Sequence, residues 1–576
     1  MVCLTRQAAF RGALFVGREI RMKEVKMQDS IQEWLKNITD EEELAALKAL
    51  TEEEKKERFG SELQFGTGGL RGIVGLGTNC MNVYTVARAT KGLAAYMRAH
   101  EMKKAAISYD SRRKSQVFAQ TAACILAAGG MEVVIVRELM PTPFLSFLTR
   151  EEKCDMGVMI TASHNPAVYN GYKVYNAAGC QITDETAKEV AGFIGRESYF
   201  KGSWKDFSEY VKEGKIVYAA EEAEEKYLRG IRNIVGKTDL RGLKIAYSAL
   251  NGTGYRLVPK LLKSAGAQVV LTQPQCIPDE NFTTCPYPNP EKREALERGL
   301  KTAKENGCDL LIATDPDADR VGIAVRYGDT YTAFTGNEVG LLLSQYLLEE
   351  QKKKGADTSR LLIIKTIVTT SLAEKIAADY GAGIINVLTG FKYIGEQIGF
   401  LEEKGQADRF LLGFEESYGY LLGTQVRDKD ALVASLAICK MAAEYREQGK
   451  NLKDVLESIY EQYGRLTNTL LSYTFAGAAG HKKIEAIMAQ FRSHPPKEIC
   501  GKTIQRCIDY RSENTGLPKS NVLQFDFGEN EGVIIRPSGT EPNLKIYMEL
   551  RRGTQSVKDY FDKFINSAQS DTFCCR

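Results

Sequence analysis

Three aspartates at alternate positions follow an apolar stretch in the middle of the chain. Asp315, Asp317 and Asp319 lie in the sequence LLIATDPDADRVGIAV, which covers residues 310–325. Alternation aims the three carboxylates toward one place, where each pair at about 6 Å would repel by roughly 0.7 kcal/mol in water and several-fold more near protein. A divalent cation removes that repulsion, and ligands made only of carboxylate oxygens favour Mg²⁺.

The main alternatives for these aspartates are an exposed acidic turn and a calcium-binding loop. An EF-hand is excluded because arginines occupy the sixth and twelfth positions counted from Asp315, where that loop needs glycine and glutamate. The proline and alanine between the aspartates also make the run too apolar and rigid for a solvated acidic surface. We therefore favour a metal site.

A serine follows another apolar stretch nearer the N-terminus. GVMITASHNPAVYNGYKVYN, over residues 157–176, places Ser163 directly after a predicted strand. In α/β proteins, reactive groups are found at the carboxyl ends of buried strands. A serine hydroxyl needs a neighbouring base or acid to manage its proton, and His164 and Lys173 are the local candidates. Taken alone, SHNP is equally compatible with an ordinary turn.

Two further stretches place polar groups next to apolar segments. LLGFEESYGY, over residues 411–420, contains adjacent glutamates, which can accept hydrogen bonds from pairs of sugar hydroxyls. In isolation this stretch would be interpreted as the start of a helix. GVIIRPSGTEPNLKIY, over residues 532–547, offers a guanidinium, two hydroxyls and backbone amides around a glycine. Such a group forms a compact phosphate cradle, although a hairpin turn is the simpler interpretation.

A repeated unit is expected to position these residues. A β-rich run, a turn, an amphipathic helix and a second β-rich run occur three times, over residues 105–136, 243–272 and 361–390. Each copy is about 30 residues long with a glycine closing the helix, which is typical of a βαβ crossover. From about Asn521, strand-like runs alternate with short polar turns before a helix-like segment. The pattern predicts three similar α/β domains and a smaller α+β domain at the C-terminus.

Composition limits the classes of partner. The 576 residues are 43% apolar and 26% charged, with a net charge of +3 that provides no field for nucleic acid. No run approaches the roughly 18 apolar residues of a membrane span. The 13 cysteines form no metal or disulfide pattern, so we expect reduced thiols and a cytoplasmic protein. No pattern selects an oligomeric state. The N-terminal segment before Met27 resembles a transit peptide only weakly, and an extended or misassigned start is favoured.

Two of these motifs together resemble a known family. TASHNP at residues 161–166 and DPDADR at residues 315–320 are similar to the phosphoserine and metal loops of the α-D-phosphohexomutases. The resemblance covers about residues 45–570 and is closest to the long phosphoglucomutase/phosphopentomutase branch. It implies an α/β fold of four domains, three similar mixed α/β domains followed by a smaller α+β C-terminal domain, around a central active-site cleft.

The resemblance also assigns tasks to the domains. We expect an N-terminal extension and leading helix over 1–44, a phosphoserine domain over 45–228, a metal-binding domain over 229–335, a sugar-binding domain over 336–460 and a phosphate-binding domain over 461–576. It implies that Ser163 carries a phosphoryl group and binds Mg²⁺ together with Asp315, Asp317 and Asp319.

The remaining site residues are implied by their positions in family motifs. The catalytic candidates besides Ser163 are His164, Lys173, Lys429 in VRDKDA, and Arg71 in LQFGTGGLRGIVG, where Gly68 replaces the family's small hydroxyl residue. Which of His164, Lys173 and Lys429 is the general acid or base stays open. The residues implied to contact sugar or phosphate are Thr67, Arg320, Thr389, Gly390, Lys392, Glu415, Ser417, Arg536, Ser538, Gly539, Thr540 and Lys545.

The implied activity is that of a phosphoglucomutase, which interconverts glucose 1-phosphate and glucose 6-phosphate through a phosphoserine enzyme and glucose 1,6-bisphosphate. The GFEES sequence favours glucose, because it is closer to the G-E-E-S form of phosphoglucomutases than to variants with Met or Gln. Phosphomannomutase and phosphopentomutase are the alternatives. A metal-dependent sugar-phosphate phosphatase and an inactive scaffold are more remote. No nucleotide site is expected, since the glycine-rich stretches fail the known fingerprints.

Overall fold

The computed structural model describes residues 24–569 except 67, 476–479 and 539–542. Contacts divide the chain into two compact units. The first contains Met1–Ala223 with Pro278–Pro288, and the second contains Glu224–Ile277 with Asn289–Arg576. None of the helices in the described ranges is both long and apolar enough to cross a membrane.

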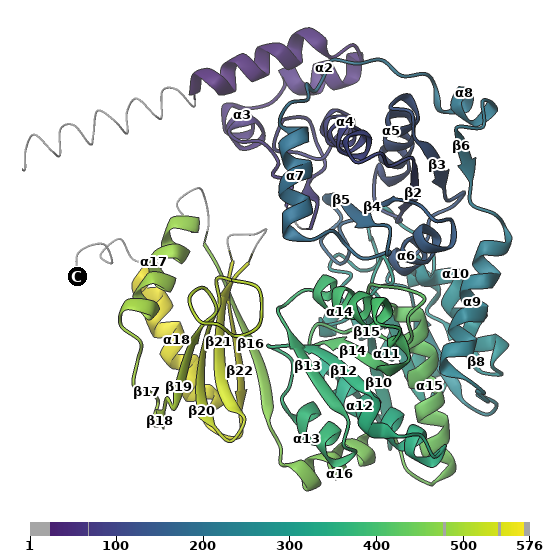
Figure 1. The fold of residues 1–576 in the computed structure, drawn as a ribbon, viewed down its shortest axis with the longest axis vertical. Coiled ribbons are helices and arrows are strands. Elements are labelled where there is room, and N and C mark those ends of the chain that lie inside the picture. The colour runs from purple at the N-terminus through teal and green to yellow at the C-terminus, as the bar shows by residue number, and fades with distance from the viewer. Residues whose placement is uncertain (1–23, 67, 476–479, 539–542, 570–576) are drawn as a thin grey trace, which may run out of the picture. The chain divides into compact units, whose positions relative to one another are not determined.

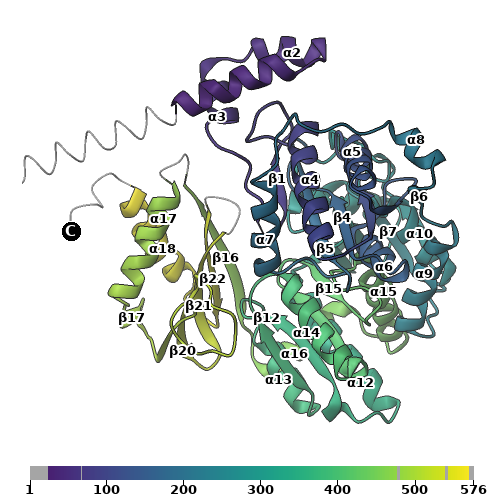
Figure 2. The same ribbon diagram turned by 45° about the horizontal axis from the view of Figure 1, so that its top comes forward.

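The first unit is built on a six-stranded sheet in the order β1-β5-β4-β2-β3-β6. Figure 1 labels β2, β3, β4, β5 and β6, and Figure 2 labels β1. Strands β2, β3, β4 and β6 are parallel, and β5 and β1 continue the sheet antiparallel. The strands are β1 (Leu70–Ile73), β2 (Lys104–Tyr109), β3 (Glu132–Ile135), β4 (Met156–Ile160), β5 (Tyr169–Asn176) and β6 (Ile216–Tyr218). The helices are α4 (Val83–Ala99), α5 (Ser115–Ala128), α6 (Thr142–Glu151), α7 (Asp184–Ile194) and α8 (Phe207–Lys212).

An aromatic cluster holds the N-terminal helices on the first unit. A helix over residues 24–37 is followed by α2 (Glu41–Lys48) and α3 (Glu52–Phe59), drawn in purple in Figure 2. Trp34 is fully buried, and its ring lies 5.3–5.5 Å from the rings of Phe59, Tyr84, Tyr199 and Phe200. Such edge and tilted contacts add to the stabilisation from burial.

The second sheet has the order β11-β10-β9-β7-β8. Its central strands are parallel, and β10 and β11 are antiparallel additions. The strands are β7 (Lys244–Ser248), β8 (Gln268–Leu271), β9 (Leu310–Thr314), β10 (Val321–Tyr327) and β11 (Thr330–Phe334). The accompanying helices are α9 (Glu222–Val235), α10 (Gly254–Ser264), η1 (Gln273–Gln275) and α11 (Arg293–Glu305).

The third sheet has the order β13-β12-β14-β15, with only β15 antiparallel to its neighbour. The strands are β12 (Leu362–Thr366), β13 (Gly383–Val387), β14 (Phe410–Glu415) and β15 (Gly419–Leu421). The helices are α12 (Gly336–Lys353), η2 (Thr358–Arg360), α13 (Leu372–Asp379), α14 (Phe391–Glu403), η3 (Ala407–Arg409), α15 (Ala431–Glu447) and α16 (Leu452–Tyr463).

The C-terminal sheet is antiparallel and has the order β16-β22-β21-β20-β19. One face packs against α17 and α18, and the other contacts Val368 and Leu388 beside the third sheet, so successive strand residues alternate between two apolar cores. The elements are β16 (Thr467–Thr474), α17 (Gly480–Ser493), β17 (Glu498–Ile499), β18 (Lys502–Thr503), β19 (Arg506–Asp509), β20 (Leu523–Gly528), β21 (Glu531–Pro537), β22 (Asn543–Leu550) and α18 (Thr554–Gln569).

The predicted series of three similar mixed α/β domains followed by a smaller α+β domain is confirmed, and the central cleft stays a prediction. Each repeat is a strand, a helix and a parallel strand, namely β2-α5-β3, β7-α10-β8 and β12-α13-β13. The C-terminal domain is the smaller α+β domain that the turn pattern predicts. The residue limits of the four domains stay predictions.

One arrangement recurs in all three α/β domains. A further strand (β4, β9 or β14) pairs parallel with the first strand of the repeat, and an antiparallel strand (β5, β10 or β15) follows it. Every residue of β4, β9 and β14 is buried, because parallel strands are covered on both faces. The loop after each of these strands carries one of the chemical motifs.

Candidate active site

The loop after β9 brings the three aspartates together. Their side chains are buried, and carboxylate oxygens from all three lie within 4.8 Å of one another. Ala318 adopts a left-handed φ of 50°, and Asp315 Oδ1 accepts hydrogen bonds from the backbone N–H groups of Asp319 and Arg320. Burial and the charges of Asp317 and Asp319 raise the pKa of Asp315 well above its usual range. A close, buried set of carboxylates fits a small divalent cation.

Lys429 lies beside this cluster. Its Nζ is 3.1 Å from Asp319 Oδ2 and 3.1 Å from Asp428 Oδ1. Burial lowers the pKa of Lys429, but the charges of Asp319 and Asp428 outweigh it and the pKa lies above its usual range. Gly419 makes room for this side chain, since a Cβ there would lie 2.2 Å from Lys429 Cδ.

The backbone of Lys429 is fixed by its neighbour Asp430. Asp430 caps α15 by accepting hydrogen bonds from the N–H groups of Leu432 and Val433. Its other carboxylate oxygen accepts a hydrogen bond of 2.9 Å from the buried hydroxyl of Tyr227 in α9. The position of Lys429 therefore depends on a helix distant in sequence.

Arg320 joins the aspartate loop to the loop after β14. Its Nη1 is 2.5 Å from Glu291 Oε1 and its Nε is 3.9 Å from Asp319 Oδ1. Arg320 also forms a β-bridge with Gly419, and the N–H of Val321 donates to the Tyr418 carbonyl. The backbone of Arg320 thus joins the aspartate loop to the loop after β14, and its guanidinium lies close to Glu291 and Asp319.

A hydrogen bond joins two of the predicted sugar-contacting residues of the third domain, Glu415 and Gly390. Glu415 is the last residue of β14 and is buried, and its Oε1 accepts a hydrogen bond of 3.0 Å from the N–H of Gly390. Burial raises the pKa of Glu415, and the charge of Lys429 acts in the opposite direction. Thr389 and Ser417 are half-buried beside these residues in sequence. Lys392 lies in α14 with its Nζ 4.7 Å from the Tyr393 ring centroid.

The interpretation of GFEES as a helix start is wrong. The strand β14 continues to Glu415, and Tyr418 takes a left-handed φ of 67° before β15 begins. The apolar run before the glutamates is a fully buried parallel strand, which periodicity alone cannot distinguish from a buried helix.

Part of the predicted phosphate cradle is described. Arg536 and Lys545 are directly opposite each other in the β21–β22 pair, and the N–H of Ser538 donates to the Asn543 carbonyl. Burial and the charge of Arg536 lower the pKa of Lys545, while the charge of Glu416 acts in the opposite direction. Gly539 and Thr540 lie outside the described residues.

In the first unit, Ser163 follows β4 at the position that the aspartates hold after β9. It is buried and has a left-handed φ of 52°. Its hydroxyl lies 3.2 Å from His164 Nδ1, and Asn165 Oδ1 accepts a hydrogen bond of 3.5 Å from Arg71 Nη1. Lys173 is buried in β5, the strand that follows the loop. Thr67 lies outside the described residues.

Sequence reasoning missed several residues that surround these groups. Asp110 and Arg112 follow β2 and contact the Ser163 loop, and Glu291 pairs with Arg320. The signal for Asp110 and Arg112 was present, because polar or charged residues directly after an apolar strand were the reason for selecting Ser163 and the aspartates. Glu291 gives no such signal, since it lies in a loop before α11.

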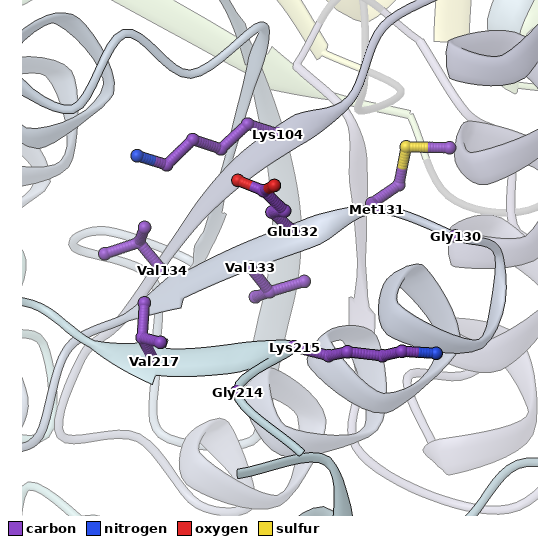
Figure 3. A pocket seen from close by; sticks show the side chains of 9 residues that line it. All are labelled: Lys104, Gly130, Met131, Glu132, Val133, Val134, Gly214, Lys215 and Val217. Carbon is purple, nitrogen blue, oxygen red and sulfur yellow. The ribbon is translucent and has the colours of Figure 1, made fainter.

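The first unit also contains a hollow of about 400 Å³, shown in Figure 3. Lys104 and Glu132, the first residues of β2 and β3, line it, whereas Ser163 follows the carboxyl end of the parallel strand β4. The hollow therefore lies at the opposite end of the strands. None of the predicted site residues lines it.

Known proteins resemble the chain over most of its length. Models of the phosphoglucomutase/phosphomannomutase alpha/beta/alpha domains match in order, domain I over residues 62–200, domain II over 225–328 and domain III over 335–463. A phosphoglucomutase of Staphylococcus saprophyticus is 37% identical over 533 residues, which are 90% of this chain and 96% of that protein. One from Staphylococcus aureus is 37% identical over 538 residues, or 90% and 95% of the two chains.

Solved structures show the same fold. A protein of Thermus thermophilus described as a phosphomannomutase has a TM-score of 0.65 at 20% identity, with 88% of this chain and 99% of that chain covered. Parafusin, a phosphoglucomutase of Paramecium, has a TM-score of 0.66 at 17% identity, with coverages of 88% and 95%.

Fold, carboxylate cluster and relatives together define a class, the sugar-phosphate mutases, which are isomerases of carbohydrate metabolism. Its substrates are sugar phosphates. Within that class, the chain belongs to the phosphoglucomutase/phosphomannomutase family, as the sequence motifs predict.

Proposed function

We propose that this protein interconverts glucose 1-phosphate and glucose 6-phosphate through a phosphoserine enzyme and glucose 1,6-bisphosphate. The observation that carries the proposal is the buried aspartate cluster, which has Lys429 and Arg320 beside it. Arg320 also bridges to Gly419, close in sequence to Glu415 at the end of β14. The choice of glucose is supported by the staphylococcal phosphoglucomutases that share 37% of their residues with the chain. A cytoplasmic location stays a prediction.

We propose that Asp315, Asp317 and Asp319, together with an oxygen of Ser163, hold Mg²⁺. The three buried carboxylates fit such an ion because their close approach needs a compensating positive charge. A bound divalent ion supplies charge stabilisation and orientation to a phosphoryl oxygen. Arg320 would add hydrogen bonds to the same phosphoryl group, since its guanidinium already lies 3.9 Å from Asp319.

In the proposed cycle, Ser163 gives its phosphoryl group to the sugar and receives another one back, so the enzyme is phosphorylated again at the end. The bond between Ser163 Oγ and phosphorus breaks as the sugar O6 bonds to phosphorus, the O6 proton passes to a general base, and Ser163 Oγ takes up a proton as it leaves. The bisphosphate then reorients within the site. In the second transfer the bond between phosphorus and O1 breaks as Ser163 Oγ bonds to that phosphorus, Ser163 Oγ gives its proton to a base, and O1 receives a proton. His164, Lys173 and Lys429 are the candidates for these proton transfers.

The other predicted residues would keep the bisphosphate bound during its turn. Glu415 and Ser417 would accept hydrogen bonds from sugar hydroxyls, with Thr389 and Gly390 on the loop after β13 and Lys392 in the first turn of α14. The phosphate that is not transferred would bind in the cradle, whose members are Arg536, Ser538, Gly539, Thr540 and Lys545. Thr67 and Arg71 would contact the phosphate at Ser163.

An assay of three substrates tests the proposal. Glucose 1-phosphate, mannose 1-phosphate and ribose 1-phosphate are each supplied with Mg²⁺ and a trace of glucose 1,6-bisphosphate, and sugar phosphates and inorganic phosphate are measured separately. We expect the highest kcat/KM for glucose 1-phosphate, little phosphate release, and phosphate on Ser163 by mass spectrometry. Preference for another sugar would reassign the substrate, and stoichiometric phosphate release would indicate a phosphatase. Absence of both activity and phosphoserine would indicate a scaffold.

A further inference from the structure

Arg112 is fully buried in the first unit and binds the backbone of the Ser163 loop. Its Nη2 donates to the carbonyl oxygens of Ser163 and Asn165. Its Nη1 donates to those of Pro166 and Tyr169, both at 2.9 Å. One planar guanidinium therefore holds four carbonyl groups of the loop that contains the proposed nucleophile.

The serine itself is in a conformation that needs support. At φ of 52°, Ser163 lies in the left-handed region, which is unfavourable for residues with a Cβ and persists where the surroundings enforce it. Arg112 binds its carbonyl group, and its N–H donates to Thr161 Oγ1 at 2.8 Å. Both peptide groups that flank the Ser163 Cα are thus fixed.

A buried aspartate links these two supports. The Asp110 carboxylate forms an ion pair with Arg112 Nε at 3.3 Å and accepts hydrogen bonds from the Arg112 N–H and Ser115 Oγ. The Thr161 hydroxyl also binds Asp110. The same carboxylate therefore orients the arginine on one side of Ser163 and the threonine on the other.

A phenylalanine completes the environment of the arginine. The Phe282 ring centroid lies 4.9 Å from the Arg112 guanidinium carbon, and the ring is fully buried. Phe282 belongs to Pro278–Pro288, a segment of the first unit whose flanking residues on both sides belong to the second unit. Asp279 shapes this segment by accepting hydrogen bonds from the N–H groups of Asn281 and Thr283.

We propose that Arg112, held between Asp110 and Phe282, is the positioning residue that sets the backbone geometry of Ser163 for phosphoryl transfer. The inference rests on the proposed role of Ser163 as phosphoryl carrier. It follows that the nucleophile is aligned partly by a segment that the chain supplies from between β8 and α11. Replacing a residue that only anchors the loop would lower the stability of the fold. Replacing a residue that positions Ser163 would also lower the rate of phosphoryl transfer in molecules that are correctly folded and phosphorylated.

The test compares Arg112→Lys and Phe282→Leu with matched controls. A lysine cannot reach four carbonyl groups from one planar head, and a leucine removes the aromatic ring while keeping an apolar side chain. Arg98→Lys is the control for charge, because Arg98 in α4 donates to the Gly129 carbonyl at the surface and, among the described residues, makes no hydrogen bond to the Pro278–Pro288 segment or the Ser163 loop. Phe144→Leu is the control for lost packing, because Phe144 is buried in α6.

Each variant is incubated with glucose 1,6-bisphosphate, and the fraction of molecules that carry phosphate on Ser163 is measured by mass spectrometry. The kcat is then divided by this fraction, which gives the rate per phosphorylated molecule. We expect Arg112→Lys to lower this kcat by about 100-fold with KM changed less than about twofold, because misalignment by about 1 Å costs that much. Phe282→Leu should lower it by about 10-fold, and both controls should match the wild type.

Unchanged kcat per phosphorylated molecule in Arg112→Lys and Phe282→Leu, with only a lower melting temperature, would overturn the inference. Equal losses in Arg98→Lys would do the same. Should Arg112→Lys fail to fold, Phe282→Leu decides the question against Phe144→Leu. A wild-type enzyme that never carries phosphate on Ser163 would contradict the proposed function itself, which distinguishes that failure from one confined to Arg112.

Discussion

Ser163 and Glu415 have different proposed tasks, and their replacement separates the two. We expect Ser163→Ala to reduce isomerisation to background because the phosphoryl carrier is lost. Glu415→Ala should lower kcat/KM by about 10- to 100-fold, as expected for the loss of hydrogen bonds between a carboxylate and sugar hydroxyls. Coupled-enzyme kinetics of both purified variants, with phosphoserine analysis, measure the difference. Equal losses would show that the two tasks are assigned wrongly.

From the aspartate cluster we predict that Asp317→Asn raises the melting temperature relative to wild type without metal and lowers it relative to wild type with Mg²⁺. Without divalent ions, Asp317→Asn should melt at a higher temperature than the wild type, because one of the three mutually repelling buried charges is removed. At a Mg²⁺ concentration 100 times Kd, the wild type should gain about 2.7 kcal/mol and the variant much less. Thermal denaturation with EDTA or Mg²⁺ measures both effects. An equal Mg²⁺ response in the two proteins would place the metal elsewhere.

The buried carboxyl group of Asp430 is expected to make the stability of the fold depend on pH. Burial raises the pKa of Asp430 from 3.8 to about 6, against the lowering effect of its hydrogen bonds. The folded protein therefore binds more protons than the unfolded chain between about pH 4 and 6, so the contribution of Asp430 to stability decreases as the pH rises through that range. Asp430→Asn removes this dependence.

The melting temperature of Asp430→Asn relative to wild type should therefore rise between pH 4 and 6. A shift of two pKa units corresponds to about 3 kcal/mol, or several degrees for a unit of this size. Scanning calorimetry at four pH values from 4 to 7 measures the difference. A constant difference across the range would mean that Asp430 titrates normally.

At the scale of elements, the sequence allowed the three βαβ repeats and the loops after β4 and β9 to be predicted. Local patterns were sufficient there, since each repeat is contiguous and its strands are uniformly apolar. The pairing of β16 with β22 was not predictable, because its partners are more than 60 residues apart and the pairing depends on tertiary packing. Arg112 was missed for a similar reason. Its contacts are with four backbone carbonyl groups more than 50 residues away in sequence, and no local sequence pattern indicates them.

The contact between β22 and α13 gives a prediction at this scale. The Glu549 carboxylate accepts hydrogen bonds from Thr370 Oγ1 at 2.6 Å, from the N–H of Ser371 at 3.1 Å and from Asn468 Nδ2 at 3.1 Å. Since hydrogen bonds to a charged group contribute about 1.5–3 kcal/mol, Glu549→Ala should destabilise this junction by that order. Hydrogen exchange should show faster exchange at the start of α13 and in β16.

Glu549→Gln serves as the control, because the amide keeps one acceptor oxygen and nearly the same volume. It should lose less protection than Glu549→Ala. Unchanged exchange in both variants would mean that the apolar contacts of Val368 and Leu388 with the C-terminal sheet hold the junction without this carboxylate.

For the whole molecule, the division into two units predicts more than one unfolding transition. All three aspartates belong to the second unit, whereas Ser163 belongs to the first. In Ser163→Ala, which lacks the proposed serine ligand, Mg²⁺ should raise the melting temperature of one transition and leave the other within about 1 °C. Calorimetry of the full chain with and without Mg²⁺ measures this. A single transition that shifts as a whole would show that the units unfold cooperatively.

The recurrence of one strand order in the three α/β domains separates the tasks of the enzyme spatially. At the same end of each sheet lie a hydroxyl after β4, carboxylates after β9 and, as the last residue of β14, the glutamate proposed to contact sugar. The loop after each of these strands contains a non-glycine residue with positive φ. A substitution in the loop of one domain can therefore change one function while the sheets that support the other two loops stay unchanged. We therefore expect that substitutions in the loop after β14 alone can change the preferred hexose, while the residues proposed for phosphoryl transfer after β4 and β9 are kept.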